Sequence, residues 1–137
     1  MSESKVPREW GSDAFAFHRQ AAWHADALNP RFPLALRVAY LAMGTHRANG
    51  HAVFKQGEVA AVLGRVDEDG HHAPADRRTV YRAIRQAIDF GMLAEGSGAL
   101  CLIVPRHRIA GGHGAPDAPC RRHPKPKATS KHLRAIS

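Results

Sequence analysis

The sequence predicts a mainly α-helical α+β fold, and three observations lead to that prediction. Apolar residues recur at helical spacing in four separate segments of the chain. Short apolar runs bounded by glycine, which are typical of strands, follow two of these segments. The chain has 137 residues, enough for one domain with tails. We therefore expect one small helical core, organised around residues 76–104.

A basic amphipathic helix is predicted over residues 77–90. Its apolar positions share one face and are Val80, Ala83, Ile84, Ala87 and Ile88. Four of the nine residues from Arg77 to Arg85 are arginine, and none of the nine is acidic. Asp76 is placed to cap the helix through the backbone N–H groups near Thr79. A charged stripe is usually only the solvated side of a helix, so its interpretation depends on the neighbouring segments.

A two-stranded wing is predicted directly after this helix, over residues 94–104. Gly91 can adopt the positive φ of a helix C′ position, so the helix should end near residue 90. Gly96-Ser97-Gly98 is a tight-turn signal between Ala94-Glu95 and the apolar run 99–104. This pattern favours a hairpin over a functional glycine loop.

An additional helix is predicted near the N-terminus, over residues 14–28, after a flexible lead-in of residues 1–11. Ser12-Asp13 can cap it. One stripe of this helix is formed by Phe17, Ala21, His24 and Leu28, with Trp23 nearby. This helix can pack on the core of its own domain, which is the expectation for most of these residues, or form a homodimer contact. Trp23 suits either role.

Two more helices and a strand complete the predicted core. Pro33 suits the first position of a helix running through Met43. Residues 51–54 form a short apolar strand that would pair with the wing. A compact helix over residues 55–63 would end at Gly64, which we expect at a C′ position.

The order of these elements resembles the winged helix-turn-helix domains of bacterial transcription regulators and of plasmid or phage replication initiators, over about residues 33–105. The resemblance implies that helix 55–63 positions helix 77–90, the recognition helix, in the major groove of DNA. One departure is the loop 65–75, because a helix-turn-helix turn has about 3–4 residues. The loop carries Asp67, Glu68 and Asp69, so it must point away from DNA or move on binding.

The residues expected to contact DNA follow from this resemblance and from their chemistry. Arginine can contact guanine or phosphate with two parallel hydrogen bonds. We therefore favour DNA binding over the alternative that this face of the helix is only solvated. The predicted contact residues are Arg77, Arg78, Thr79, Tyr81, Arg82, Arg85, Gln86, Lys55, Gln56 and Ser97.

The net charge of +8 is distributed unevenly. Residues 1–105 hold 12 basic against 11 acidic residues, whereas residues 106–137 hold 8 basic residues against Asp117 alone. Apolar periodicity disappears after Pro105, while glycine, proline and charged residues dominate. The division predicts a domain over residues 12–105, followed by a disordered basic tail, 106–137, that attracts phosphate.

Ten histidines and two cysteines raise the question of a metal. The candidate ligands in the loop are Asp67, Asp69, His71 and His72, and those in the tail are His107, His113, Cys120 and His123. Only Cys120-x-x-His123 has the close spacing of a zinc ligand pair, and prolines surround it. We therefore expect solvated side chains, free thiols at Cys101 and Cys120, no metal and no cofactor. Any metal would occupy a weak accessory site.

The catalytic motifs of hydrolases, metalloproteases and nucleotide-binding enzymes are missing from the sequence. Tyr40 and Tyr81 lack the cluster of ligands or catalytic residues that a strand-transfer nucleophile needs. We expect a protein without catalytic residues that binds double-stranded DNA, most simply a transcriptional regulator. The alternatives are a replication initiator that binds repeated sites and a protein-interaction module. The N-terminus lacks a secretory signal and no apolar run could span a membrane, so we expect a cytoplasmic protein.

Overall fold

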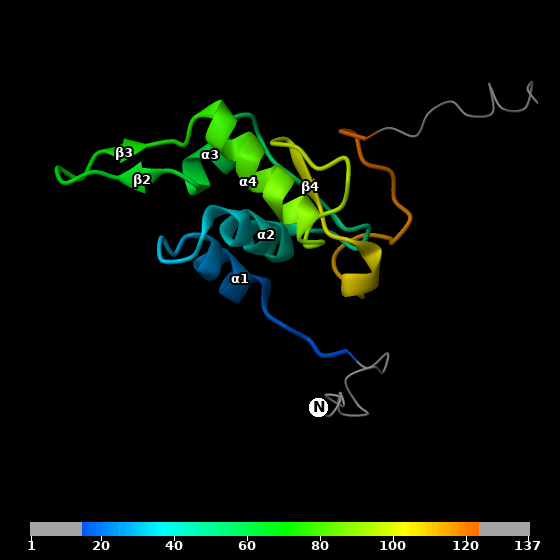
Figure 1. Ribbon diagram of the computed structural model, residues 1–137. Coiled ribbons are helices and arrows are strands. Elements are labelled where there is room, and N and C mark those ends of the chain that lie inside the picture. The colour runs from blue at the N-terminus through cyan, green and yellow to red at the C-terminus, as the bar shows by residue number, and fades with distance from the viewer. Residues whose placement is uncertain (1–14, 124–137) are drawn as a thin grey trace, which may run out of the picture.

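The computed structural model describes residues 15–123, which form four α-helices and two antiparallel strand pairs (Figure 1). The elements in order are α1 (Gln20–Ala27), α2 (Leu34–Thr45), β1 (His51–Val53), α3 (Glu58–Val62), β2 (Arg65–Val66), β3 (His72–Ala73), α4 (Arg77–Asp89) and β4 (Cys101–Ile103), followed by a 3₁₀ turn, Arg106–Arg108. The mixed α+β class predicted from the sequence is confirmed. No helix within residues 15–123 is both long and apolar enough to cross a membrane.

Helix α1 packs on α2, although it is shorter than predicted. Residues 15–19 are not helical, and Ser12-Asp13 lies outside the described residues. Trp23 stacks on Tyr40 of α2 with ring centroids 5.5 Å apart, and Ala27 is fully buried. The four residues of the predicted stripe are exposed instead, Phe17 by 94%, although the His24 ring lies 2.9 Å from the Thr45 hydroxyl of α2. Trp23 therefore packs within its own domain.

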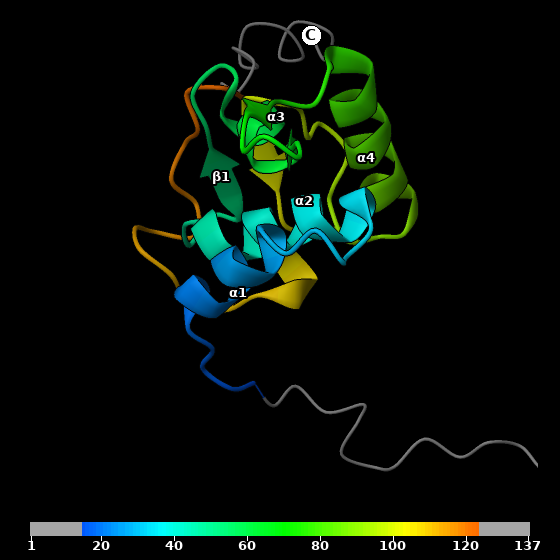
Figure 2. The same cartoon turned by 90° about the vertical axis from the view of Figure 1, so that its left-hand side faces the viewer.

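Helix α2 forms the centre of the core. The helix begins at Leu34, one residue later than predicted, and Pro33 is its N-cap residue. Val38, Leu41 and Ala42 are buried against the inner face of α4, where Ala83 and Ala87 allow the two helices to approach closely. Figure 2 shows α4 and β1 on opposite sides of α3, with α2 beneath them.

Strands β1 and β4 pair antiparallel, as expected for the segment 51–54 and the wing. Ala52 lies opposite Leu102, and both are fully buried on the core face. Because successive side chains alternate between the faces of a strand, His51 and Cys101 share the other face. That face is covered by the segment that follows residue 105.

The wing differs in detail from the predicted hairpin. The reversal is at Ala99-Leu100, between Gly98 and Cys101, whose backbones exchange hydrogen bonds. Only Ala94 of the expected first strand bonds to β4, through its N–H to the carbonyl of Ile103. The turn is displaced because Cys101 must pair with β1, which fixes the register of β4.

The connection between α3 and α4 is a β-hairpin, not an unstructured loop. β2 and β3 pair antiparallel and project from the body of the domain (Figure 1). Gly64 does not have the positive φ of a C′ residue, so that prediction is wrong. A side chain at Gly64 would meet the backbone of Ala73 and Pro74, which explains why the start of the hairpin needs glycine. Gly57, ahead of α3, has φ 84° instead.

Both ends of α4 are as predicted. The carboxylate of Asp76 accepts a 2.7 Å hydrogen bond from the N–H of Thr79, and Gly91 has φ 79° directly after the C-cap residue Phe90. The buried positions of α4 are Val80, Ala83, Ile84 and Ala87. Local sequence signals therefore located this helix to within one residue.

Residues 106–123 pack against the domain, which corrects the expectation of a disordered tail beginning at residue 106. Ile109 packs against the core, and Cys120 is buried. The N–H of Ala48 donates to the carbonyl of His113, and the Asn49 side chain donates to the carbonyl of Ala118. These bonds run between loops, so the segment carries no periodic sequence signal. The remaining tail, 124–137, and the lead-in, 1–14, lie outside the described residues.

Candidate nucleic-acid interface and metal centre

Three of the predicted DNA contacts form a strip on α4 opposite its buried face. Arg78, Arg82 and Gln86 follow one another at intervals of four residues, and all three are exposed. Within residues 15–123 no carboxylate lies within ion-pair distance of Arg78 or Arg82. Both guanidinium groups therefore face solvent on a rigid helix.

Five other predicted contacts surround one groove of about 570 Å³ beside this strip. The groove lies between α4, the start of α3 and the turn of the wing. The five residues are Gln56, Arg77, Tyr81, Arg85 and Ser97. Tyr81 is 66% exposed, and Ile84 and Ile88 form part of the floor. The structure thus gathers residues from three segments that are distant in the sequence.

Several predicted contacts have structural roles. Arg85 is ion-paired to Glu95 at 2.8 Å and to Asp89 at 3.3 Å, so it ties α4 to the wing. These two partners raise the pKa of Arg85, Glu95 contributing most. The hydroxyl of Ser97 accepts a hydrogen bond from the N–H of Ile103. The Thr79 backbone belongs to the Asp76 cap.

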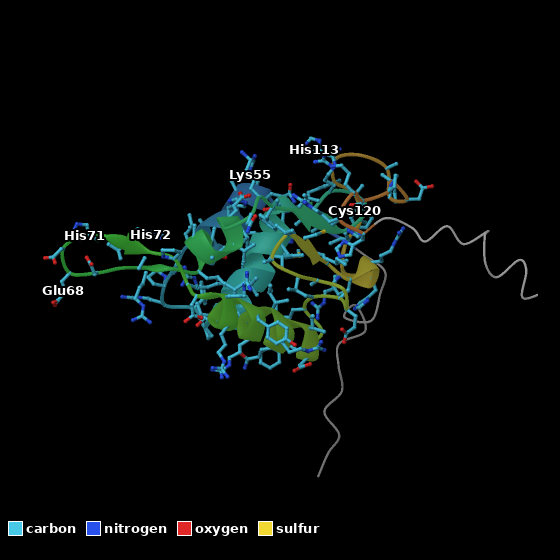
Figure 3. All side chains as sticks on the ribbon, turned by 90° about the horizontal axis from the view of Figure 1, so that it is seen from above. Lys55, Glu68, His71, His72, His113 and Cys120 are labelled. Atoms are coloured by element: carbon cyan, nitrogen blue, oxygen red, sulfur yellow. The ribbon has the colours of Figure 1, made fainter. Side chains whose placement is uncertain are left out.

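Lys55 does not join the group. Figure 3 shows it on the far side of the molecule from α4. Its backbone N–H donates to the carboxylate of Glu58, which makes it part of the entry to α3.

A second site, of which the sequence indicated only the pair Cys120 and His123, lies behind the wing. The side chains of His51, Cys101, Cys120 and His123 converge so that one ligand atom of each lies within 4.8 Å of all the others. The two sulfurs are 3.8 Å apart. The Cys101 Sγ is 3.4 Å from His51 Nδ1, and the Cys120 Sγ is 3.8 Å from His123 Nδ1. Both cysteines are buried and both histidines are half-buried.

The hydrogen bonds of His123 orient it toward the sulfurs. Its Nε2 lies 2.7 Å from the carbonyl oxygen of Gly96. A carbonyl can only accept, so Nε2 carries the proton, and Nδ1 of the neutral ring presents its lone pair toward Cys120. The ring is therefore held in the tautomer that can bind a metal.

The four groups perturb one another's protonation. Burial, with a smaller contribution from Cys120, raises the pKa of the Cys101 thiol to about 12. Burial opposes ionisation of Cys120 as well, but the contact with His123 and the backbone of residue 122 together lower its pKa. The Cys120 contact raises the pKa of His123, against the effect of burial. Burial lowers the pKa of His51, and the charge of His123 lowers it further.

Only some of the metal ligands that were proposed from the sequence lie close to one another in the structure. Of the tail candidates, Cys120 and His123 meet, whereas His107 and His113 lie elsewhere. Their partners, His51 and Cys101, come from β1 and β4. Cys120 is not the solvated thiol that was expected.

The loop candidates form a separate exposed group. Near the tip of the β2–β3 hairpin lie Asp67, Asp69 and His71. The Asp67 carboxylate accepts hydrogen bonds from the backbone N–H groups of the other two residues. His72 instead bonds to the carbonyl of Ala61. Figure 3 shows Cys120 at the opposite end of the molecule from His71.

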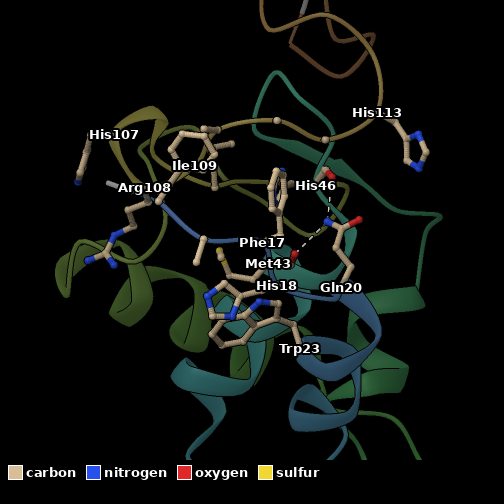
Figure 4. Close-up of a pocket in the computed structure, with 15 residues that line it drawn as sticks. Phe17, His18, Gln20, Trp23, Met43, His46, His107, Arg108, Ile109 and His113 are labelled. Atoms are coloured by element: carbon tan, nitrogen blue, oxygen red, sulfur yellow. Dashed lines mark hydrogen bonds between the residues drawn. The ribbon is translucent and has the colours of Figure 1, made fainter. Parts of the chain in front are cut away.

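A cleft of about 620 Å³ lies between residues 15–18, α1 and residues 107–113 (Figure 4). Gln20 crosses it and donates to the carbonyls of Met43 and His46. Among the described residues that line it, none is a carboxylate, a cysteine or a hydroxyl residue. The ionisable side chains among these lining residues are Arg108 and four histidines, His18, His46, His107 and His113.

Comparison with protein-family models, with curated proteins and with solved structures finds no match to this chain.

Proposed function

We propose that the protein binds double-stranded DNA, with α4 as the recognition helix of a winged helix-turn-helix domain. The observation that carries the proposal is the strip of Arg78, Arg82 and Gln86 on α4. Arginine and glutamine are the side chains that read guanine and adenine edges in the major groove with paired hydrogen bonds. They stand on a helix whose other face is anchored in the core.

The arrangement of the elements supports the proposal. The order α2, β1, α3, α4, β4 and the pairing of β1 with β4 are those expected of a winged domain. Arg77 begins α4, so its cationic side chain adds to the positive end of the helix dipole where phosphate would lie. The acidic β2–β3 hairpin projects from the body (Figure 1), so it would extend past the duplex.

Selection from random duplexes, followed by binding measurements on the enriched sequence, tests the proposal. Arg78→Ala and Arg82→Ala should each weaken specific binding by about 1–3 kcal/mol, the range for removing a side chain that reads a base edge. The matched control is the pair Arg19→Ala and Arg31→Ala, which removes the same charge from exposed positions at α1 and the following loop. Circular dichroism checks that all variants remain folded.

The outcomes separate three kinds of protein. Loss of binding in the α4 variants but not in the controls supports the recognition helix. Equal losses of DNA affinity in the α4 variants and in the controls would mean that the protein binds DNA only through non-specific charge attraction. Folded α4 variants that bind like the parent, or a parent that enriches no duplex, would overturn the proposal in favour of a protein-interaction module.

The biological role within this proposal is transcriptional regulation. A regulator would protect one palindrome, bound by a homodimer, in DNA from the gene's own neighbourhood. A replication initiator would protect an array of direct repeats. Nuclease footprinting distinguishes them, because palindrome symmetry mirrors the twofold symmetry of a dimer.

A further inference from the structure

The cluster behind the wing has the dimensions of a tetrahedral zinc site. With zinc–sulfur bonds of about 2.3 Å and zinc–nitrogen bonds of about 2.0–2.1 Å, the two sulfurs of such a site lie about 3.8 Å apart and each sulfur–nitrogen pair about 3.5 Å apart. The sulfurs of Cys101 and Cys120 are 3.8 Å apart. Two of the four sulfur–nitrogen pairs, Cys101 with His51 and Cys120 with His123, lie 3.4 and 3.8 Å apart, and all four ligand atoms lie within 4.8 Å of one another.

We propose that His51, Cys101, Cys120 and His123 bind one Zn²⁺ ion as a structural Cys₂His₂ site. Two thiolates and two imidazoles form a donor set that binds Zn²⁺ in preference to harder cations such as Mg²⁺ and Ca²⁺. All four positions are supplied by the protein, so the site is closed to substrate. Binding releases the two thiol protons, and the two thiolates balance the charge of the ion.

The surroundings of the ligands favour this site. The Gly96 carbonyl fixes the His123 ring through Nε2, an outer-shell contact that metal-binding histidines commonly make. His51 and Cys101 are held on one face of the β1–β4 ladder, so half of the site is preformed by strand register. Cys120 and His123 form a tight turn, with the N–H of His123 bonded to the carbonyl of Cys120.

The ion would fasten the C-terminal segment to the domain. Residues 106–123 are tethered mainly by loop hydrogen bonds and contain no α-helix between Arg108 and Cys120. A link from β4 to Cys120 closes this segment into a loop, and closing a loop reduces the entropy of the unfolded chain. The metal would therefore stabilise the region that covers the back of the wing. This inference does not depend on DNA binding.

A disulfide between Cys101 and Cys120 is the competing use of the same sulfurs. It would leave His51 and His123 without a ligand role, although His123 points its free nitrogen at Cys120. Sulfurs in a disulfide are about 2.05 Å apart, so the pair would have to close from its present separation. The zinc-bound protein would contain Zn²⁺ and two thiols that react after denaturation, whereas the disulfide form would contain neither.

The experiment measures zinc and thiols in the full chain, purified without chelator under reducing conditions and then desalted. We expect one Zn²⁺ per chain by elemental mass spectrometry, and two reactive thiols after denaturation in chelator. Apoprotein titrated with Co²⁺ should develop the visible bands of tetrahedral cobalt and a sulfur-to-cobalt charge-transfer band. This titration requires no variant, so it is informative even if ligand variants misfold.

Matched variants locate the ion. His123→Gln and Cys120→Ser should weaken zinc binding by more than about 100-fold, the upper end of the cost of losing only an outer-shell partner. His113→Gln removes an exposed histidine from the same segment and should bind zinc like the parent.

Three results would overturn the proposal. The first is reduced apoprotein that binds neither Zn²⁺ nor Co²⁺. The second is a Cys101–Cys120 disulfide with no zinc in protein purified with or without reductant. The third is folded His123→Gln and Cys120→Ser proteins that retain zinc at parental affinity, which would place the ion at another cluster.

Discussion

The guanidinium of Arg85 lies 2.8 Å from the carboxylate of Glu95, and this ion pair joins α4 to the wing. The same guanidinium contacts Asp89 one turn later on α4. Hydrogen bonding to Arg85 lowers the pKa of Glu95, so the pair is ionised at neutral pH. Of the four arginines on α4, Arg85 is therefore committed to the protein, whereas Arg77, Arg78 and Arg82 have no such partner within residues 15–123.

Glu95→Gln should increase the affinity for DNA of any sequence, given the proposed interface, because Arg85 loses its closest carboxylate and can reach phosphate. One additional phosphate contact would steepen the slope of log affinity against log salt by about 0.9. Titrations at several salt concentrations measure this. Asp117→Asn, which removes the same charge from an exposed loop, is the control. Equal slopes for both variants and the parent would mean that the C-terminal half of α4 does not face DNA.

The sequence predicted the elements whose signals are local. Asp76 and Gly91 bracket α4 by capping chemistry alone, and the short apolar runs around Ala52 and Leu102 predict strands. The metal cluster could not be predicted in this way, because His51 and Cys101 are 50 residues apart and become neighbours only through β1–β4 pairing. Cys101 also sits in an apolar strand, where a buried thiol is ordinary. Only the Cys120-x-x-His123 spacing signalled half of the site.

Arg37→Ala should destabilise the domain by about 3 kcal/mol, because two charge-assisted hydrogen bonds are removed and two carbonyls lose their donor. Arg37 is only 5% exposed. Its guanidinium donates to the carbonyl of Ala27, at the end of α1, and to that of Val62, in α3. Burial lowers its pKa, and no carboxylate pairs with it among the described residues.

Arg37→Lys should recover only part of this loss, since an ammonium cannot reproduce a planar fork that serves two carbonyls. Urea denaturation measures all variants, with Arg31→Ala as the exposed control, expected within about 0.5 kcal/mol of the parent. An Arg37→Ala protein as stable as the control would mean that water satisfies both carbonyls.

The Asp76 cap predicts a specific acid sensitivity of α4. Hydrogen bonds from Thr79 lower the pKa of Asp76 below its ordinary value of 3.8. A lowered pKa means that the folded state favours the carboxylate. This contribution is therefore complete above about pH 4 and is lost as the pH falls through the lowered value.

Asp76→Asn provides the test, because asparagine also caps helices but does not titrate in this range. At pH 7 we expect Asp76→Asn to melt close to the parent and Asp76→Ala to melt at a lower temperature. As the pH falls below about 4, the parent should lose more stability than Asp76→Asn. Parallel pH profiles for these two proteins would show that the cap does not contribute through its charge.

Two truncations separate the structural and electrostatic parts of the C-terminal segment. Removing residues 106–137 deletes Ile109, the backbone partners of Ala48 and Asn49, and two of the four proposed metal ligands. We expect a lower melting temperature and no bound zinc. Removing residues 124–137 keeps all of these interactions and deletes four of the 20 basic residues. Its melting temperature and zinc content should match those of the full chain.

On DNA, the shorter truncation should flatten the salt dependence, because each phosphate that is no longer neutralised removes about 0.9 from the slope. It should lower affinity for all sequences alike and leave the ratio of specific to non-specific binding intact, since bonds to phosphate do not read bases. Differential scanning calorimetry and binding titrations measure the two effects separately. If removal of residues 106–137 left the melting temperature unchanged, the packing of residues 106–123 would contribute nothing to stability.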